Sequence, residues 1–293
     1  MHPVAMLDGD TALMVTEHDM RPTFFAYDRR TGRHRALATA PEWAECDLCF
    51  EVMNVAVSET DIVWTAGIYR SESGNPGKRH VELWAMPRSG GMMRPVAWLT
   101  EHGDPSGELT VTGDNATWTN ESENRTYLVP LRGGRGMSEI SPSAGPRPVA
   151  ADPEVREFSC GVEWCVGEVR PRRNEVTTML VQRRDGSGRT AVAAASSGRT
   201  LIGDRFGLFN QPYVYGGGSV DISSDDLRAH AVVYDRCTGK AARAGAQREA
   251  GESPRVRVGA TNRQEPILFW PTRDEKHYVV LDLSRIPDRS CEG

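Results

Sequence analysis

Apolar and polar residues alternate along this chain over short stretches that come in pairs, and a polar turn joins each pair. The stretch FFAYDRRTGRHRALA, Phe24–Ala38, shows the pattern: two alternating segments flank a polar run that begins at Asp28 and contains Gly32. Alternation with a period of two is typical of half-buried strands, and Asp and Gly between them indicate a hairpin. The outline recurs at Val81–Leu99, Thr126–Ile140, Thr178–Ala193, Ala231–Gly245 and, with little strand after the turn, His277–Arg289.

A second hairpin pattern, with a tight polar turn, precedes each of these segments. It occupies Val4–Val15, Asn54–Trp64, Leu109–Trp118, Phe158–Gly167, Thr200–Phe209 and Val256–Trp270. Each unit therefore holds four strands in up-and-down order, here named a, b, c and d, and the c–d turn recurs every 44 to 59 residues. Four-stranded repeats of ~40–50 residues are typical of propeller blades. The chain shows no helical periodicity, so a βαβ architecture is not expected.

These repeats predict an all-β fold, a six-bladed β-propeller of four-stranded up-and-down antiparallel blades in one domain spanning residues 1–293. A lone sheet cannot cover both its faces, whereas radially arranged blades pack on their neighbours. Aromatic residues that end strand b, such as Trp64, Trp118 and Phe209, suit this packing. The last blade is expected to lack strand d, because little chain follows its strand c. The blades are expected at roughly 1–40, 50–101, 107–150, 155–198, 199–246 and 255–293.

The repeat resembles the six-bladed β-propellers of the TolB-like superfamily. The stretch VELWAMPRSGGMMRPVAWLT, Val81–Thr100, is similar to that family's pattern of strand, polar turn and strand. The family's usual Ser-Pro-Asp-Gly turn between strands a and b is missing, and its nearest counterpart is Leu7–Asp10. The resemblance covers the whole chain as a repeat architecture and implies the fold. It implies no function, because one fold carries many functions.

Composition excludes two classes of partner. The chain has 40 acidic and 35 basic residues, a net charge of −5, and its arginines are scattered, so no basic stripe for nucleic acid is visible. No run approaches the ~18 apolar residues that a membrane-spanning helix needs. The excess of arginine over lysine is typical of a GC-rich bacterial genome.

The N-terminal segment and the cysteines bear on the compartment. The residues after Met1, HPVAMLDGD, lack the basic stretch and apolar core of a signal peptide, so the chain is either cytoplasmic or a trimmed form of a longer exported protein. The cysteines favour export, because an even number in locally paired positions fits a disulfide framework. They are Cys46, Cys49, Cys160, Cys165, Cys237 and Cys291.

We expect bonds between Cys160 and Cys165 and between Cys237 and Cys291, while the bonding of Cys46 with Cys49 stays open. The alternative is six free thiols in a cytosolic protein. A four-thiolate zinc site would need the first two pairs to converge, although a whole blade separates them. A redox-active CxxC motif usually lies at a helix N-terminus, and no helix is expected near Cys46.

Motifs for hydrolysis, phosphate binding and metal binding are missing. The chain has no G-x-S-x-G, no H-E-x-x-H and no EF-hand loop, and the glycine-rich Tyr215–Ser219 lacks the lysine of a phosphate loop. Neither a cofactor nor a metal is therefore expected. TolB-like propellers also serve as gating domains of serine peptidases, but this sequence contains no hydrolase half.

The loops are the remaining candidates for a site. In an up-and-down blade the b–c and d–a loops lie at one end and the a–b and c–d turns at the other, and here the first set is longer. The b–c loop Asn210–Ala229 is the longest, and loops beyond ~12–15 residues in compact domains are usually functional or disordered. The predicted ligand-binding residues are Tyr213, Tyr215, His18, Asp19, His102 and Asp104.

Tyr213 and Tyr215 are the expected anchors, because a tyrosine offers a large amphipathic surface with few rotatable bonds. We interpret the chain as a non-catalytic, extracytoplasmic bacterial propeller, secreted or anchored at a surface, that binds a protein, peptide or glycan through the b–c and d–a loops. The alternative is a propeller lyase or hydrolase that uses histidines and carboxylates at the central channel. Convergence of His18, His102 or His277 with carboxylates within ~4–6 Å would favour the enzyme. A third possibility is a purely structural domain of a longer surface protein.

Overall fold

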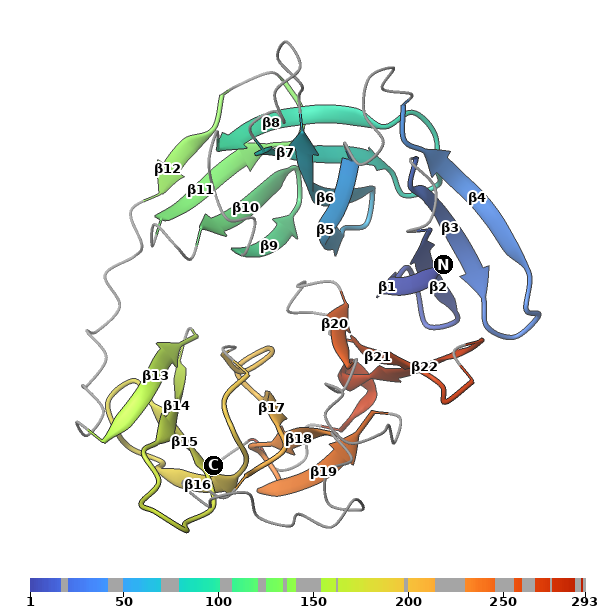
Figure 1. The fold of residues 1–293 in the computed structure, drawn as a ribbon. Helices are drawn as coiled ribbons and strands as arrows, with labels where there is room; N and C mark the ends of the chain where they lie inside the picture. The colour runs from blue at the N-terminus through green and yellow to red at the C-terminus, as the bar shows by residue number, and fades with distance from the viewer. Residues whose placement is uncertain are drawn as a thin grey trace. The chain divides into compact units, whose positions relative to one another are not determined.

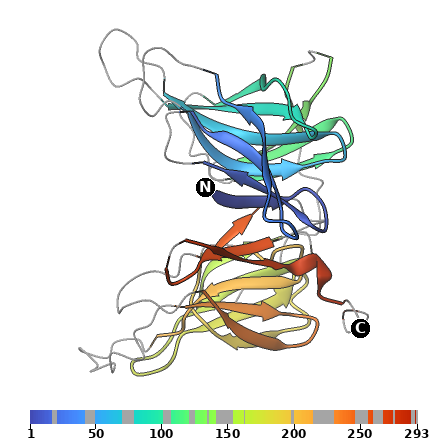
Figure 2. The same cartoon turned by 90° about the vertical axis from the view of Figure 1, so that its right-hand side faces the viewer.

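The computed structural model forms 22 strands, β1 to β22, and one 3-10 turn, η1, over the residues that it describes (Figure 1). These residues are 1–16, 21–41, 50–69, 79–100, 107–120, 125–133, 136–140, 154–161, 163–197, 200–213, 230–245, 256–259, 267–274, 276–287 and 291. Six sheets contain all of these strands, and within each sheet the strands lie side by side in chain order (Figures 1 and 2).

The first four sheets have four strands each and correspond to the first four predicted blades. Blade one consists of β1 (His2–Met6), β2 (Thr11–Val15), β3 (Thr23–Asp28) and β4 (His34–Thr39). Blade two consists of β5 (Phe50–Val57), β6 (Asp61–Tyr69), β7 (Arg79–Pro87) and β8 (Arg94–Thr100). Blade three consists of β9 (Gly107–Thr112), β10 (Asn115–Asn120), β11 (Arg125–Pro130) and β12 (Ser138–Ile140). Blade four consists of β13 (Val155–Cys160), β14 (Trp164–Val169), β15 (Thr178–Arg183) and β16 (Thr190–Ala193).

The last two sheets have three strands each. Blade five consists of β17 (Phe206–Asn210), β18 (Ala231–Asp235) and β19 (Lys240–Ala244). Blade six consists of β20 (Arg257–Gly259), β21 (Ile267–Pro271) and β22 (Tyr278–Asp282), after which η1 (Leu283–Arg285) follows. The all-β, six-bladed class is confirmed. In the part of the tail that the structure describes, η1 follows β22 and no further strand forms.

Blade five differs from the expected four strands, because its strand a is reduced to isolated bridges. Gly203 and Asp204 have φ values of 59° and 55°, so the chain reverses within a few residues. Ile202 and Phe206 then bond to each other in both directions, at 2.8 and 3.0 Å, in place of a longer ladder. The alternating pattern of Thr200–Phe209 therefore produced one strand where two were predicted.

The chain divides into two compact units. The first comprises Met1–Ser143, Val258–Leu268 and Val280–Ser284, and the second comprises Ala144–Arg257, Phe269–Val279 and Arg285–Gly293. Blades one to three belong to the first unit, blades four and five to the second, and blade six contributes residues to both. That the chain forms one domain with the predicted blade boundaries stays a prediction.

Aromatic side chains pack neighbouring sheets together inside each unit. Between blades one and two, the Trp64 ring lies 4.9 Å from Phe24 and 6.4 Å from Trp84, centroid to centroid. Trp118 fills the core between blades two and three, and Phe209 the core between blades four and five. The predicted packing role of strand b is thereby confirmed for these residues. Each large buried side chain stabilises the fold by about 1.5–3 kcal/mol.

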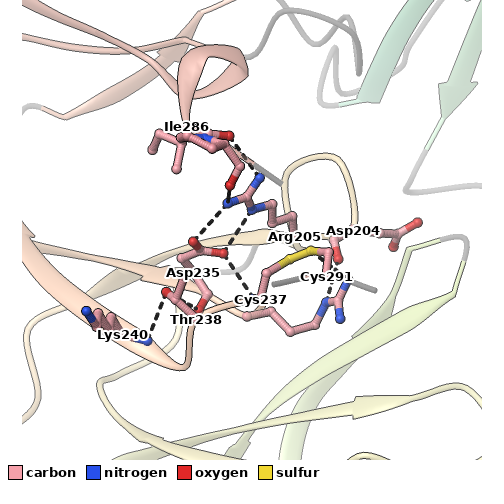
Figure 3. A network of polar contacts seen from close by, with 10 residues as sticks. Asp204, Arg205, Asp235, Cys237, Thr238, Lys240, Ile286 and Cys291 are labelled. Carbon is pink, nitrogen blue, oxygen red and sulfur yellow. Dashed lines mark hydrogen bonds and ion pairs between the residues drawn. A yellow bond between two sulfur atoms is a disulfide. The ribbon is translucent and has the colours of Figure 1, made fainter. Parts of the chain in front are cut away.

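Two disulfides lie in the second unit. Cys160 and Cys165 flank the a–b turn of blade four, directly opposite each other on β13 and β14, with an S–S distance of 2.01 Å. This bond confirms the prediction from their spacing. The structure also joins Cys237, in the c–d turn of blade five, to Cys291, whose Cα atom is 4.5 Å away (Figure 3). Cys46 and Cys49 lie outside the described residues.

A buried arginine holds the C-terminal segment beside this second disulfide. Arg205 Nε and Nη2 donate to the two carboxylate oxygens of Asp235 at 2.9 and 3.0 Å (Figure 3). The same guanidinium donates to the backbone carbonyl oxygens of Ile286 at 3.1 Å and Pro287 at 3.0 Å. Asp235 in turn accepts a hydrogen bond from the Cys237 amide at 3.0 Å. One side chain thus connects the end of β18 to the residues after η1.

The pKa of the Asp235 carboxyl reflects this arrangement. Burial on its own would raise the pKa, but the hydrogen bonds from Arg205 and from the Cys237 amide, together with the charge of Arg205, outweigh it. The pKa of Asp235 therefore lies below its ordinary value.

Replacing Arg205 by Met is expected to lower the free energy of unfolding by about 3 kcal/mol, because Asp235 then stays buried without its partner. The measurement is urea-induced unfolding followed by tryptophan fluorescence. Arg205→Lys serves as the matched control, since it keeps the charge but loses the planar fork, and a smaller loss is expected. Equal stability of Arg205→Met and the wild type would contradict this role of Arg205.

The lowered pKa of Asp235 also predicts a pH dependence. Its contribution to stability is fully present above the ordinary aspartate pKa and is lost as the pH falls through the lower folded-state value. Urea unfolding between neutral and acidic pH is expected to show a decline that is shallower in Asp235→Asn. An identical acid slope in the variant would show that other carboxyl groups account for the decline.

Candidate functional site

Most of the predicted ligand-binding residues lie outside the part of the chain that the structure describes. These are His18, Asp19, His102, Asp104 and Tyr215. Tyr213 is described, and it lies three residues after β17, at the start of the long b–c loop of blade five. The ends of the blades that carry the b–c and d–a loops are here called the loop ends, and the opposite ends the turn ends.

The backbone of Tyr213 is fixed to the neighbouring blade. Its amide donates to Thr177 Oγ1 at 3.0 Å, and its carbonyl oxygen accepts a hydrogen bond from the Thr177 amide at 2.9 Å. Thr177 is fully buried and directly precedes β15. The b–c loops of blades four and five are therefore joined at this point.

Tyr213 and its neighbour across this pairing are exposed. Tyr213 is 48% exposed, and Val176, which precedes Thr177, is 49% exposed. These two residues are here called the Tyr213 patch. An apolar group and an aromatic ring thus face solvent from a backbone that hydrogen bonds hold in place. Tyr213 is therefore not part of the core.

Short turns support both sides of the Tyr213 patch. In the b–c loop of blade four, the Arg172 amide donates to Glu175 Oε2 at 2.9 Å, and the Glu175 amide donates to the Arg172 carbonyl at 3.0 Å. At the base of the long loop, Gln211 Oε1 accepts from the His230 amide at 3.4 Å. Hydrogen bonds thus hold the backbone on both sides of the Tyr213 patch.

A second exposed aromatic group lies at the loop end of blade two, in the first unit. His80, near the start of β7, packs on Trp98, near the end of β8, with a centroid distance of 4.4 Å. Trp98 is 41% exposed. Neither residue was predicted as a site residue. The sequence could have indicated that Trp98 is exposed, since a large aromatic residue in the outer strand of a blade has fewer residues to pack against.

Of the histidines named for the enzymatic alternative, only His277 lies within the described residues. Its Nδ1 atom is 3.6 Å from Asp274 Oδ2, in the b–c turn of blade six. The side chains are 75% and 53% exposed, so water screens the pair. Among the described residues, no group of three or more His, Cys, Asp and Glu side chains could hold a metal ion.

In the described parts of the chain, no helix has the length and apolar character needed to cross a membrane.

Among known proteins, the chain matches solved structures, through its fold. No protein-family model and no curated protein matches the chain. TolB from Acinetobacter baumannii is similar at 12% identity, over 88% of this chain and 55% of that chain, with a TM-score of 0.44. An oligogalacturonate lyase in complex with manganese is similar at 10% identity, over 98% and 77%, with a TM-score of 0.44. A chain of the nidogen–laminin complex is similar at 11% identity, over 94% and 90%, with a TM-score of 0.40.

TolB is thus among the structures that are similar to this chain. The chain spans about half the length of that TolB chain. At such low identity the likeness concerns the fold alone, and the function has to be argued from the residues.

Replacing Thr177 by Val is expected to lower the free energy of unfolding by about 1–3 kcal/mol, because the Tyr213 amide loses its acceptor. Hydrogen exchange at that amide is expected to become faster. The matched control is Thr178→Val, one residue further on, whose hydroxyl donates only to the Val176 carbonyl, at 3.3 Å. Unchanged exchange at the Tyr213 amide in Thr177→Val would contradict the proposed fixation.

Proposed function

We propose that this protein is a non-catalytic binding module of an extracytoplasmic compartment, and that it binds a protein or peptide at the loop ends of blades four and five. The observation that carries the proposal is the fixed, exposed Tyr213. Both hydrogen-bonding groups of its backbone are paired with Thr177, while the residue is 48% exposed.

Preorganisation is what makes such a residue suitable for binding. Association costs free energy when loops and side chains become ordered, and a backbone that is already bonded reduces that cost. Tyrosine is among the residues that dominate the energetics of protein interfaces. A tyrosine on a fixed backbone therefore contributes more binding free energy than the same residue on an unpaired loop.

Val176 favours a protein or peptide over a glycan as the partner. An aliphatic side chain gains free energy only when apolar surface covers it, at about 25 cal/mol per Å². A protein or peptide supplies aliphatic and aromatic side chains for this purpose, whereas a sugar presents mostly hydroxyl groups.

The disulfides support the proposal that the protein is located outside the cytoplasm. Structural disulfides persist in oxidising surroundings and are rare in the cytosol. The bond between Cys160 and Cys165 closes a single hairpin, and that between Cys237 and Cys291 connects residues 54 positions apart. Both types of link are expected in an exported protein.

The enzymatic alternative finds no comparable support. His277 and Asp274 form its only described pair, and both side chains are largely exposed. A catalytic acid or base usually lies in a water-excluded site beside close charges, whereas both of these side chains are exposed to water.

A random peptide library displayed on phage provides the test, with the disulfide-intact protein as the immobilised target. Peptides that the wild type enriches are expected to bind Tyr213→Ser about tenfold or more weakly, since interface tyrosines are often hot spots. The measurement is the Kd of synthetic peptides by calorimetry. Circular dichroism shows whether each variant is folded.

Met92→Ser is the matched control, because Met92 is 86% exposed in the c–d turn of blade two, at a turn end. It removes an exposed apolar side chain from a different blade and is expected to leave the Kd unchanged. Equal affinity of wild type and folded Tyr213→Ser would overturn the proposal. Binding on a glycan array without any peptide binding would overturn the class of partner.

A further inference from the structure

A pocket of about 550 Å³ lies at the turn ends of blades two and three, within the first unit. It belongs to neither of the exposed groups at the loop ends. Its walls come from the starts and ends of strands on two adjacent blades. The lining residues are Asp61, Pro87, Arg94, Pro95, Val96, Pro130, Leu131, Arg132 and Gly133.

Asp61 is a buried member of the lining, and hydrogen bonds hold its carboxylate and its backbone. Asp61 is only 5% exposed, and its Oδ2 atom accepts from the Thr60 hydroxyl at 2.6 Å. Its backbone closes a tight turn with Ser58: the Asp61 amide donates to Ser58 Oγ at 2.9 Å, and the Ser58 amide donates to the Asp61 carbonyl at 2.8 Å. A negative charge is thereby fixed in the lining of the pocket.

Two arginines approach this carboxylate, but they do so unequally. Arg132 Nη2 donates to Asp61 Oδ2 at 3.2 Å, and its Nε lies 3.6 Å from Asp114 Oδ1. Arg94 Nη2 lies 3.9 Å from Asp61 Oδ1, beyond hydrogen-bonding distance. The Arg132 ion pair therefore connects the two blades without help from Arg94.

Arg94 consequently has hydrogen-bonding capacity to spare. A guanidinium carries five N–H donors. Within the described residues, the Arg94 side chain donates no hydrogen bond, its ion-pair partner Asp61 lies 3.9 Å away, and the side chain is 39% exposed. The N–H groups of the Arg94 guanidinium can therefore still donate hydrogen bonds, and they carry a positive charge. A ligand that fits them has a negatively charged group that accepts hydrogen bonds.

The rest of the lining indicates what the remainder of the ligand is like. The rings of Pro87, Pro95 and Pro130 and the side chains of Val96 and Leu131 are apolar. The pocket combines these apolar groups with the polar groups of Asp61, Arg94 and Arg132, and its volume lies within the range of about 300 to 1,000 Å³ that is typical of small-molecule sites. A carboxylate matches the planar fork of arginine, because two parallel hydrogen bonds form at once.

We propose that this pocket binds a carboxylate attached to a small apolar body, with the carboxylate on Arg94 and the apolar body against the prolines. Asp61 and Arg132 are positioning residues: Asp61 keeps the guanidinium groups at the pocket, and Arg132 neutralises the charge of Asp61. The carboxylate comes either from a free organic acid or from the C-terminus of a peptide.

Two acids and their neutral amides test the inference with the whole 293-residue chain. The probes are cyclohexanecarboxylate and N-acetylvaline, each compared with its carboxamide, by saturation-transfer NMR and calorimetry. The acids are expected to bind at least about tenfold more tightly than the amides, as a charge-assisted hydrogen bond requires. Their binding is expected to weaken as sodium chloride is added, because salt screens exposed charges.

The two acids also distinguish the two sources of the carboxylate. Tighter binding of cyclohexanecarboxylate identifies a free acid as the source, and tighter binding of N-acetylvaline identifies a peptide C-terminus.

Arg94→Gln is the decisive variant, and it is expected to weaken acid binding about tenfold or more without changing amide binding. Arg173→Gln is the matched control, because Arg173 is an exposed arginine in the turn between β14 and β15. Equal binding of acid and amide to the wild type would overturn the inference, and this comparison needs no variant. Undiminished acid binding to folded Arg94→Gln would overturn it as well, as would the absence of acid binding at millimolar concentration.

Discussion

The packing of one sheet on the next through large aromatic side chains is the interaction on which both units depend. A four-stranded sheet has two faces, and in the first unit Trp64 contacts Phe24 from blade one while it also packs on Trp84 of its own blade. In the second unit, Trp164, Phe209 and Tyr234 belong to one buried cluster. These contacts join strands b and c of neighbouring blades. The strand ends and the loops take no part in them and can therefore differ from one blade to the next.

Carboxylates with little exposure at the turn ends add polar links to this packing, and two of them, Asp235 and Asp61, differ in how completely arginine donors pair with them. Asp235 receives both arms of Arg205, whose remaining contacts reach the carbonyls of Ile286 and Pro287. Asp61 receives one arm of Arg132, and Arg94 stays at 3.9 Å. The pair of Arg205 and Asp235 stabilises the fold, but its hydrogen-bonding groups are used within the protein and are not left for a ligand. The incompletely used pair retains donors, and this difference is why a binding site is inferred at one turn end and not at the other.

The loop ends have a different physical character. Exposed apolar and aromatic side chains occur there, as in the Tyr213 patch and at Trp98, which packs on His80. Here hydrogen bonds fix the backbone, and the side chains face solvent. Such a surface suits a partner that covers apolar area, whereas the pocket between blades two and three suits a small charged ligand. The two proposals therefore concern different chemistry and can fail independently.

The sequence by itself determined the strands, the turns, the number of blades and the bond between Cys160 and Cys165. All of these depend on residues close together in the chain, where a period of two and a polar turn suffice. Strand a of blade five was predicted but is reduced to isolated bridges, because two left-handed residues, Gly203 and Asp204, override the alternation. Only the tertiary structure decided which distant side chains meet. Asp61 and Arg132 are 71 positions apart, and Arg205 and Pro287 are 82 apart. Their pairing follows from how one sheet lies on the next, and no local pattern encodes that arrangement.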